Sequence, residues 1–103
     1  MVYLLLGRFT MSNNATEANK TVVHGSVEPG FEPVMAAFAE NFSLHGDIGA
    51  ACALYHKGRC VVDLWGGVAD PDSNRPWERD TITLVFSAAK GPTAVCINRL
   101  VEG

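Results

Sequence analysis

The sequence predicts a small α/β (α+β) domain made of a helix, an antiparallel β-hairpin and a second helix with a serine at its start. Three observations predict it. Apolar residues recur at helical spacing between residues 32 and 44, two apolar runs flank a Lys57-Gly58 turn, and a third run leads directly into Ser87. At 103 residues the chain is at most one small domain.

Residues 1–24 are predicted to be a poorly ordered lead-in, and residues 25–103 to form the domain. The apolar run at residues 2–6 is too short for a secretory signal and has no basic residues before it. Either Met1 or Met11 could be the start of translation.

The first helix is predicted from Glu32 to Leu44, with Pro33 tolerated in its first turn and Gly46 as a stop. Its apolar stripe is interpreted as a core-facing surface rather than a cofactor site. The stripe consists of Phe31, Val34, Met35, Phe38 and Phe42.

Residues 50–56 and 59–65 are predicted to be the two strands of the hairpin. Alternation predicts one face with Ala50, Cys52, Leu54, Val61 and Trp65, and another with Ala51, Ala53, Tyr55, Val62 and Leu64. Because both faces are apolar and one helix covers only one of them, the sheet is predicted to be incomplete.

The two glycines Gly66 and Gly67 are predicted to end the second strand, and a polar turn is predicted to follow them. Asp70 and Asp72 in that turn are interpreted as turn-forming residues, because the ligand pattern of a calcium loop is absent. Trp77 is interpreted as a packing residue.

Composition excludes several classes of protein. The net charge is −3 and the eight basic residues are scattered, which argues against nucleic-acid binding. No apolar run approaches the ~20 residues of a membrane span. Three cysteines without paired or zinc-type spacing predict reduced thiols, a cytoplasmic chain and no metal site. We expect Cys52 opposite Asp63 and Cys60 opposite Tyr55, with the two thiols on different faces.

Ser87 and Lys90 are the candidate catalytic residues. A helix predicted from about Ser87 to Val101 would bring them to one face, where lysine can take the proton of a serine nucleophile. The Gly91-Pro92 pair would lie inside this helix and kink it. The Ser-x-x-Lys spacing alone is weak evidence for a catalytic pair, because about 0.15 such matches are expected by chance in a chain of this composition. A serine N-cap followed by a solvated lysine is the alternative interpretation.

The context of the pair resembles the N-terminal part of the serine beta-lactamase-like superfamily, in its branch of class C beta-lactamases and related esterases. The resemblance covers residues 28–103. Its features, in order, are the hairpin, Trp65-Gly66-Gly67-Val68-Ala69-Asp70, Arg75-Pro76-Trp77, Asp80-Thr81 and Phe86-Ser87-Ala88-Ala89-Lys90-Gly91.

The resemblance implies that Ser87 accepts an acyl group, that Lys90 assists its deprotonation, and that the Ser87 amide is half of an oxyanion hole. It implies a small-molecule ester or amide substrate, including β-lactams, and neither a metal nor an organic cofactor. The family's Tyr-x-Asn/Ser motif is absent, since Tyr3 and Tyr55 lack that context and both precede Ser87, and no later strand with a Lys/His-x-Gly motif follows Ser87 in this sequence. The resemblance therefore implies a truncated piece that is inactive and marginally folded alone.

The alternative function is a non-catalytic α/β module, or a gene remnant, that binds a partner through the exposed edge of the hairpin. Under this alternative Ser87 is only an N-cap. Unpaired sheet edges also predict self-association of the chain.

Overall fold

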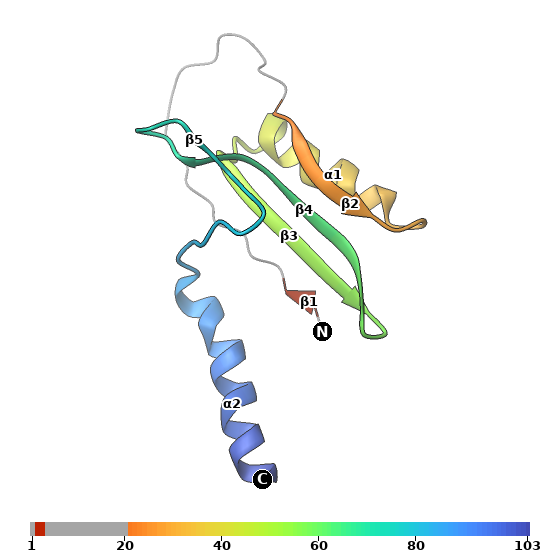
Figure 1. The fold of residues 1–103 in the computed structure, drawn as a ribbon, viewed down its shortest axis with the longest axis vertical. Helices are drawn as coiled ribbons and strands as arrows, with labels where there is room; N and C mark the ends of the chain where they lie inside the picture. Colours follow the sequence, from red (N-terminus) through yellow and green to blue (C-terminus); the bar gives the residue numbers. More distant parts are fainter. Residues whose placement is uncertain (1, 4–20) are drawn as a thin grey trace.

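A computed structural model describes residues 2–3 and 21–103 as an antiparallel sheet with one helix packed on it and a second helix standing away from it (Figure 1). This architecture confirms the predicted mixture of helices and antiparallel strands. The elements are β1 (Val2–Tyr3), β2 (Val23–Val27), α1 (Glu32–Leu44), β3 (Gly49–His56), β4 (Arg59–Asp70), β5 (Arg75–Pro76), the 3-10 helix η1 (Phe86–Ala89) and α2 (Lys90–Glu102).

The strands of the sheet lie in the order β1-β3-β4-β2, and β5 pairs with the last residues of β4. Of the hairpin strands, β4 is interior, whereas β3 is paired by β1 only at Ala53 and Leu54, so the rest of its outer edge has no strand neighbour among the described residues. The outermost strands of the sheet are β1 and β2.

The sequence analysis did not predict β2, because its three central residues are His24, Gly25 and Ser26, which have low strand propensity. Its terminal valines, Val23 and Val27, pack against the core. β1 and the start of β2 fall within the predicted lead-in, while the prediction for residues 1 and 4–20 lies outside the described residues.

The hairpin turn is at Lys57-Gly58 as predicted, but a bulge beyond it changes the register. Tyr55 pairs with Cys60, as expected, whereas Leu54 pairs with Val62, so Val61 is an extra residue on β4. Cys52 consequently lies opposite Leu64 and not opposite Asp63.

The predicted faces of β4 were therefore wrong for Val62, Leu64 and Trp65, whereas Val61 lies in the same core as Cys52, as predicted. Because cross-strand partners share a face, Cys52 and Leu54 lie on the same side as Leu64 and Val62. The opposite face carries Ala51, Ala53, Asp63 and Trp65, all half-buried.

The α1 helix has the predicted bounds and covers the first of these faces (Figure 1). Pro33 lies in its first turn, where no intrahelical N–H bond is lost. The core between α1 and the sheet consists of Phe38, Ala50, Cys52, Val61, Val62 and Leu64. Phe38 belongs to the predicted apolar stripe of α1, and the other residues of the stripe pack against this core. Burial in the core raises the pKa of the Cys52 thiol.

The strand β4 does not end at Gly66-Gly67 as predicted but continues to Asp70. The glycines allow close approach of chain segments instead of breaking the strand. The Gly67 backbone has a φ of +82°, and a Cβ atom there would overlap the Ile48 carbonyl oxygen. The neighbouring Val68 N–H donates to that same oxygen at 2.8 Å.

The second helix begins later than predicted. Ser87 lies in η1, and α2 starts at Lys90, so Pro92 falls in its first turn and does not kink its interior. Among the described elements the main contact of α2 is with η1, which directly precedes it in the chain, and α2 projects away from the sheet (Figure 1).

Candidate active site

The candidate nucleophile Ser87 is an exposed residue of η1. Lys90 ends this 3-10 helix, and its backbone N–H donates to the Ser87 carbonyl oxygen. Side chains three residues apart eclipse one another in a 3-10 helix, so Ser87 and Lys90 lie on the same side of the turn. The spacing that puts them on one side is thus that of a 3-10 turn and not that of the expected α-helix.

The backbone N–H of Ser87 has no backbone acceptor among the described residues. The next amide, that of Ala88, donates to the Val85 carbonyl oxygen at 3.0 Å and closes the first turn of η1. The Ser87 amide is therefore available to donate a hydrogen bond to an oxyanion.

The residue before Ser87 has a strained backbone, which the sequence analysis missed. Phe86 has a φ of +46°, a left-handed conformation that is uncommon for a bulky residue. Its side chain is 84% exposed, so no local packing compensates for the strain. Strained residues of this kind cluster at functional sites. The sequence gives no signal for this conformation, since phenylalanine is not a residue that favours it.

Trp77 anchors the segment that leads to Ser87. Its backbone N–H donates to the Gly67 carbonyl oxygen at 2.9 Å, and its side chain is buried against Gly49. This confirms Trp77 as a packing residue. Its indole Nε1 is buried without a hydrogen-bond partner among the described residues.

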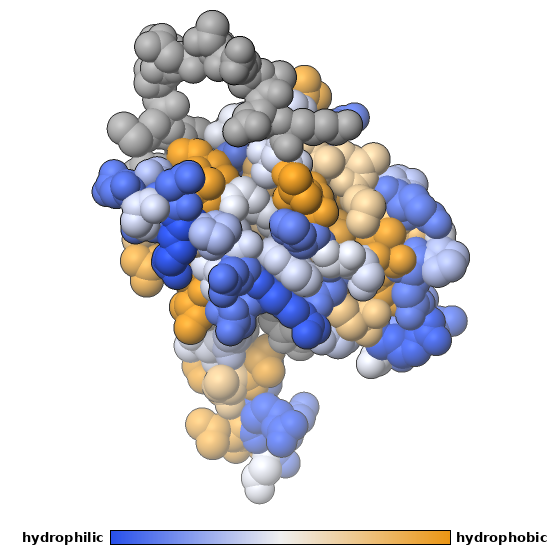
Figure 2. Space-filling view, turned by 45° about the horizontal axis from the view of Figure 1, so that its top comes forward, coloured by the Kyte–Doolittle hydropathy of each residue, from blue (hydrophilic) through white to orange (hydrophobic). Residues whose placement is uncertain are grey.

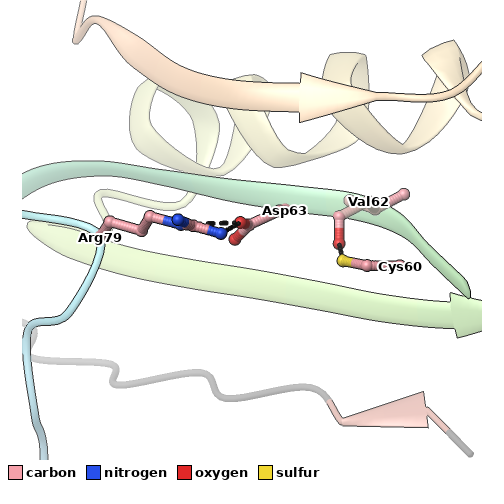
Figure 3. A network of polar contacts seen from close by, with 4 residues as sticks. All are labelled: Cys60, Val62, Asp63 and Arg79. Carbon is pink, nitrogen blue, oxygen red and sulfur yellow. Dashed lines mark hydrogen bonds and ion pairs between the residues drawn. The ribbon is translucent and has the colours of Figure 1, made fainter.

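A second anchor follows two residues later. The Arg79 guanidinium pairs with the Asp63 carboxylate at 3.0 Å (Figure 3). Asp63 belongs to the face of β4 opposite α1, so this ion pair holds the segment against the open face of the sheet. Sixteen residues separate the two charges in the sequence, and no local pattern indicates that they meet.

The turn after β4 is built as predicted. Asp70 accepts hydrogen bonds from the Asp72 backbone N–H at 3.1 Å and from the Ser73 hydroxyl at 2.6 Å. The Ser73 hydroxyl and the Asp72 amide lower the pKa of the Asp70 carboxyl. Both carboxylate oxygens of Asp70 thus accept hydrogen bonds within the turn. Within the described residues no three acidic, histidine or cysteine side chains are grouped to hold a metal ion.

Comparison with known proteins shows which family this sequence belongs to. The sequence model of the Beta-lactamase family matches residues 35–103, a stretch that includes most of α1 and all of the hairpin, η1 and α2. The chain belongs to the beta-lactamase family. It is also 40% identical to "Esterase/beta-lactamase LipL" of Mycobacterium tuberculosis over 95 residues, which are 92% of this chain and 22% of LipL.

The beta-lactamase match includes both candidate residues, Ser87 and Lys90, as well as both anchors of the preceding segment. The chain spans about a fifth of the length of LipL. Tyr55, which is not in a Tyr-x-Asn/Ser motif, lies exposed beside the hairpin turn.

No helix among the described residues is both long and apolar enough to cross a membrane.

Proposed function

We propose that this chain supplies the nucleophile-bearing part of a serine hydrolase that acts on carboxylic esters or β-lactams. The observation that carries the proposal is the Ser87–Lys90 pair on one side of a helical turn, within a stretch that matches the beta-lactamase family. The name of the relative LipL, an esterase/beta-lactamase, supports the substrate class. The cytoplasmic setting expected from the cysteines stays a prediction.

The proposed reaction is acyl transfer to serine followed by hydrolysis. The Ser87 Oγ attacks the carbonyl carbon, its proton passes to the Lys90 amine, and the C=O electron pair moves onto oxygen. The oxyanion accepts a hydrogen bond from the Ser87 N–H. Collapse of the intermediate expels the alcohol or lactam nitrogen, which takes the proton. Water then cleaves the acyl-serine ester and restores the Ser87 hydroxyl.

Residues 88–103 contain no Lys/His-x-Gly strand to supply a second oxyanion donor, and losing one such donor costs about 10²–10³ in rate. We therefore expect little or no hydrolysis of a p-nitrophenyl ester by residues 1–103. Turnover by this chain that disappears in Ser87→Ala would support the chemistry but contradict the need for further residues.

The decisive test uses a chimera in which the matched stretch of LipL is replaced by this chain. A fluorophosphonate probe should label Ser87, identified by peptide mass spectrometry. Ser87→Ala should reduce esterase turnover by at least about 10³-fold, because no other group can carry the acyl chain. Ser73→Ala is the matched control and should leave labelling unchanged. Equal labelling of the Ser87→Ala chimera would overturn the proposal.

A further inference from the structure

Phe86, the residue directly before Ser87, has a backbone conformation that its place in the fold does not require. Three non-glycine residues among those described have a positive φ, namely Lys57 at +49°, Asn74 at +52° and Phe86 at +46°. Lys57 and Asn74 lie in the turns that join β3 to β4 and β4 to β5, where paired strands fix the turn. Phe86 has no paired strand on either side, and phenylalanine tolerates a positive φ poorly.

Packing of the Phe86 ring does not compensate for this conformation. Phe86 is 84% exposed, and the projecting part of the chain, which contains η1 and α2, carries apolar side chains on its surface (Figure 2). A glycine would adopt the same φ without a steric penalty. Within the described residues the conformation is therefore held by the backbone around Phe86 and not by contacts of its ring.

Hydrogen bonds on both sides of Ser87 fix this turn. The Ala88 N–H donates to the Val85 carbonyl oxygen at 3.0 Å, which closes a four-residue turn with Phe86 and Ser87 in its middle. The Lys90 N–H donates to the Ser87 carbonyl oxygen. The amides of Ala88 and Lys90 are thus used within the turn, whereas the Ser87 N–H has no acceptor among the described residues.

The φ of Phe86 determines where the free Ser87 amide points. Phe86 has a positive φ and Ser87 does not, which are the signs of a type II′ turn, where glycine is the usual second residue. A right-handed 3-10 turn has a φ of about −60° at that residue, so the two conformations differ by roughly 100° of rotation about the Phe86 N–Cα bond. That rotation would redirect the Ser87 N–H relative to the segment that Trp77 and Arg79 attach to the sheet.

We propose that Phe86 is a positioning residue of the active site, and that the φ of its backbone, not its ring, aims the Ser87 N–H at the oxyanion. The inference rests on the proposed function and deepens it. A donor that is fixed before the reaction needs no reorganisation when the negative charge develops, and an oxyanion donor is effective for this reason. The strained backbone of Phe86 holds the Ser87 amide in the direction that the oxyanion needs.

Substitutions that differ in their tolerance of a positive φ test the proposal in the LipL chimera. Phe86→Gly and Phe86→Asn remove the ring but adopt a positive φ readily, so each should keep the rate of fluorophosphonate labelling at Ser87 within about threefold of the parent. Phe86→Val keeps an apolar side chain but strongly disfavours that φ. Its labelling should slow by about 10²-fold, which is the effect of a lost oxyanion donor.

A second measurement separates positioning from a general structural role. In single-turnover acylation by a p-nitrophenyl ester, Phe86→Val should lower the acylation rate constant and leave the apparent Kd of the ester unchanged, because the donor acts on the charge of the transition state. Leu84→Val is the matched control. Leu84 is also exposed but does not have a positive φ, so this variant should label like the parent.

The outcomes separate this proposal from the proposed function. A parent chimera that is not labelled at Ser87 would overturn the hydrolase, and the role of Phe86 with it. If the parent is labelled and Phe86→Gly, Phe86→Asn and Phe86→Val all slow equally, the ring is what matters and the backbone role is wrong. Equal labelling of the parent and Phe86→Val would show that the conformation is not needed.

The glycine and alanine variants keep the test decisive if Phe86→Val does not fold. Phe86→Ala differs from Phe86→Gly by one methyl group, and alanine disfavours a positive φ. Phe86→Ala should therefore label at least about tenfold more slowly than Phe86→Gly, since left-handed strain at alanine opposes the required turn. Equal rates for the two variants would overturn the proposal.

Discussion

At the residue scale, backbone conformation matters as much as side-chain chemistry in this chain. Gly67 has a positive φ in the middle of β4, and Phe86 has one directly before Ser87. At Gly67 the conformation costs little, because glycine has no Cβ atom. At Phe86 it is strained, and a structure that holds such a residue must stabilise it elsewhere.

We predict that Gly67→Ala destabilises the chain by about 3 kcal/mol or more, since left-handed strain adds to the overlap with the Ile48 carbonyl. The matched control is Gly46→Ala. Gly46 has a similar φ of +69° but no atom within 4 Å of the added methyl, so strain alone should cost about 1 kcal/mol. Urea unfolding followed by tryptophan fluorescence measures both. Equal losses in the two variants would contradict the close approach at Gly67.

The residue scale is also where the sequence was least informative. The Ser87–Lys90 spacing was recognisable, but the φ of Phe86 and the Arg79–Asp63 pair were not. The bulge at Val61 was missed for the same reason, because one extra residue reverses the faces of a strand without changing its composition. These features depend on neighbours that are distant in sequence.

At the element scale, predictions succeeded where several local signals agreed. The bounds of α1 were predicted correctly because an early proline, an apolar period and a glycine stop coincide. The start of α2 was placed three residues early because Ser87 was interpreted as the start of the α-helix, which made Pro92 an interior proline when it belongs to the first turn. Gly66-Gly67 was interpreted as a break because glycine signals both strand ends and close packing.

The hairpin turn gives a prediction at this scale. Lys57 and Gly58 have φ values of +49° and +78°, as a type I′ turn requires. Lysine is poorly suited to the first of these positions, whereas asparagine tolerates it. Lys57→Asn should therefore raise the free energy of unfolding by about 0.5–1 kcal/mol, measured in urea. Arg59→Asn, which lies beyond the turn, should not raise the free energy of unfolding. An increase in that variant would show that the turn conformation does not cause the stabilisation by Lys57→Asn.

At the scale of the whole molecule, α2 stands apart from the other described elements, and every one of its residues is exposed. An isolated helix of 13 residues is marginal in water, because nucleation is costly and few residues repay it.

Hydrogen exchange of the isolated chain should therefore distinguish a weakly protected α2 from a strongly protected sheet. Amides of α2 should exchange within about a hundredfold of the unfolded rate, while those of β3 and β4 should be protected close to the global stability. The α1 helix is the internal control, because it also has 13 residues but packs on the core. Protection of α2 equal to that of α1 would mean that α2 is covered in the isolated chain.

Trp77 and Arg79 attach the segment before Ser87 to the sheet, and this attachment limits how far Ser87 can move from the sheet. Eight residues separate Arg79 from Ser87, a length of at most about 26–29 Å when fully extended. Even if η1 and α2 melted, the serine hydroxyl would stay within that radius of the sheet, at an effective concentration of the order of millimolar. A protein that recruits the sheet therefore obtains the proposed nucleophile with it, without an independent encounter.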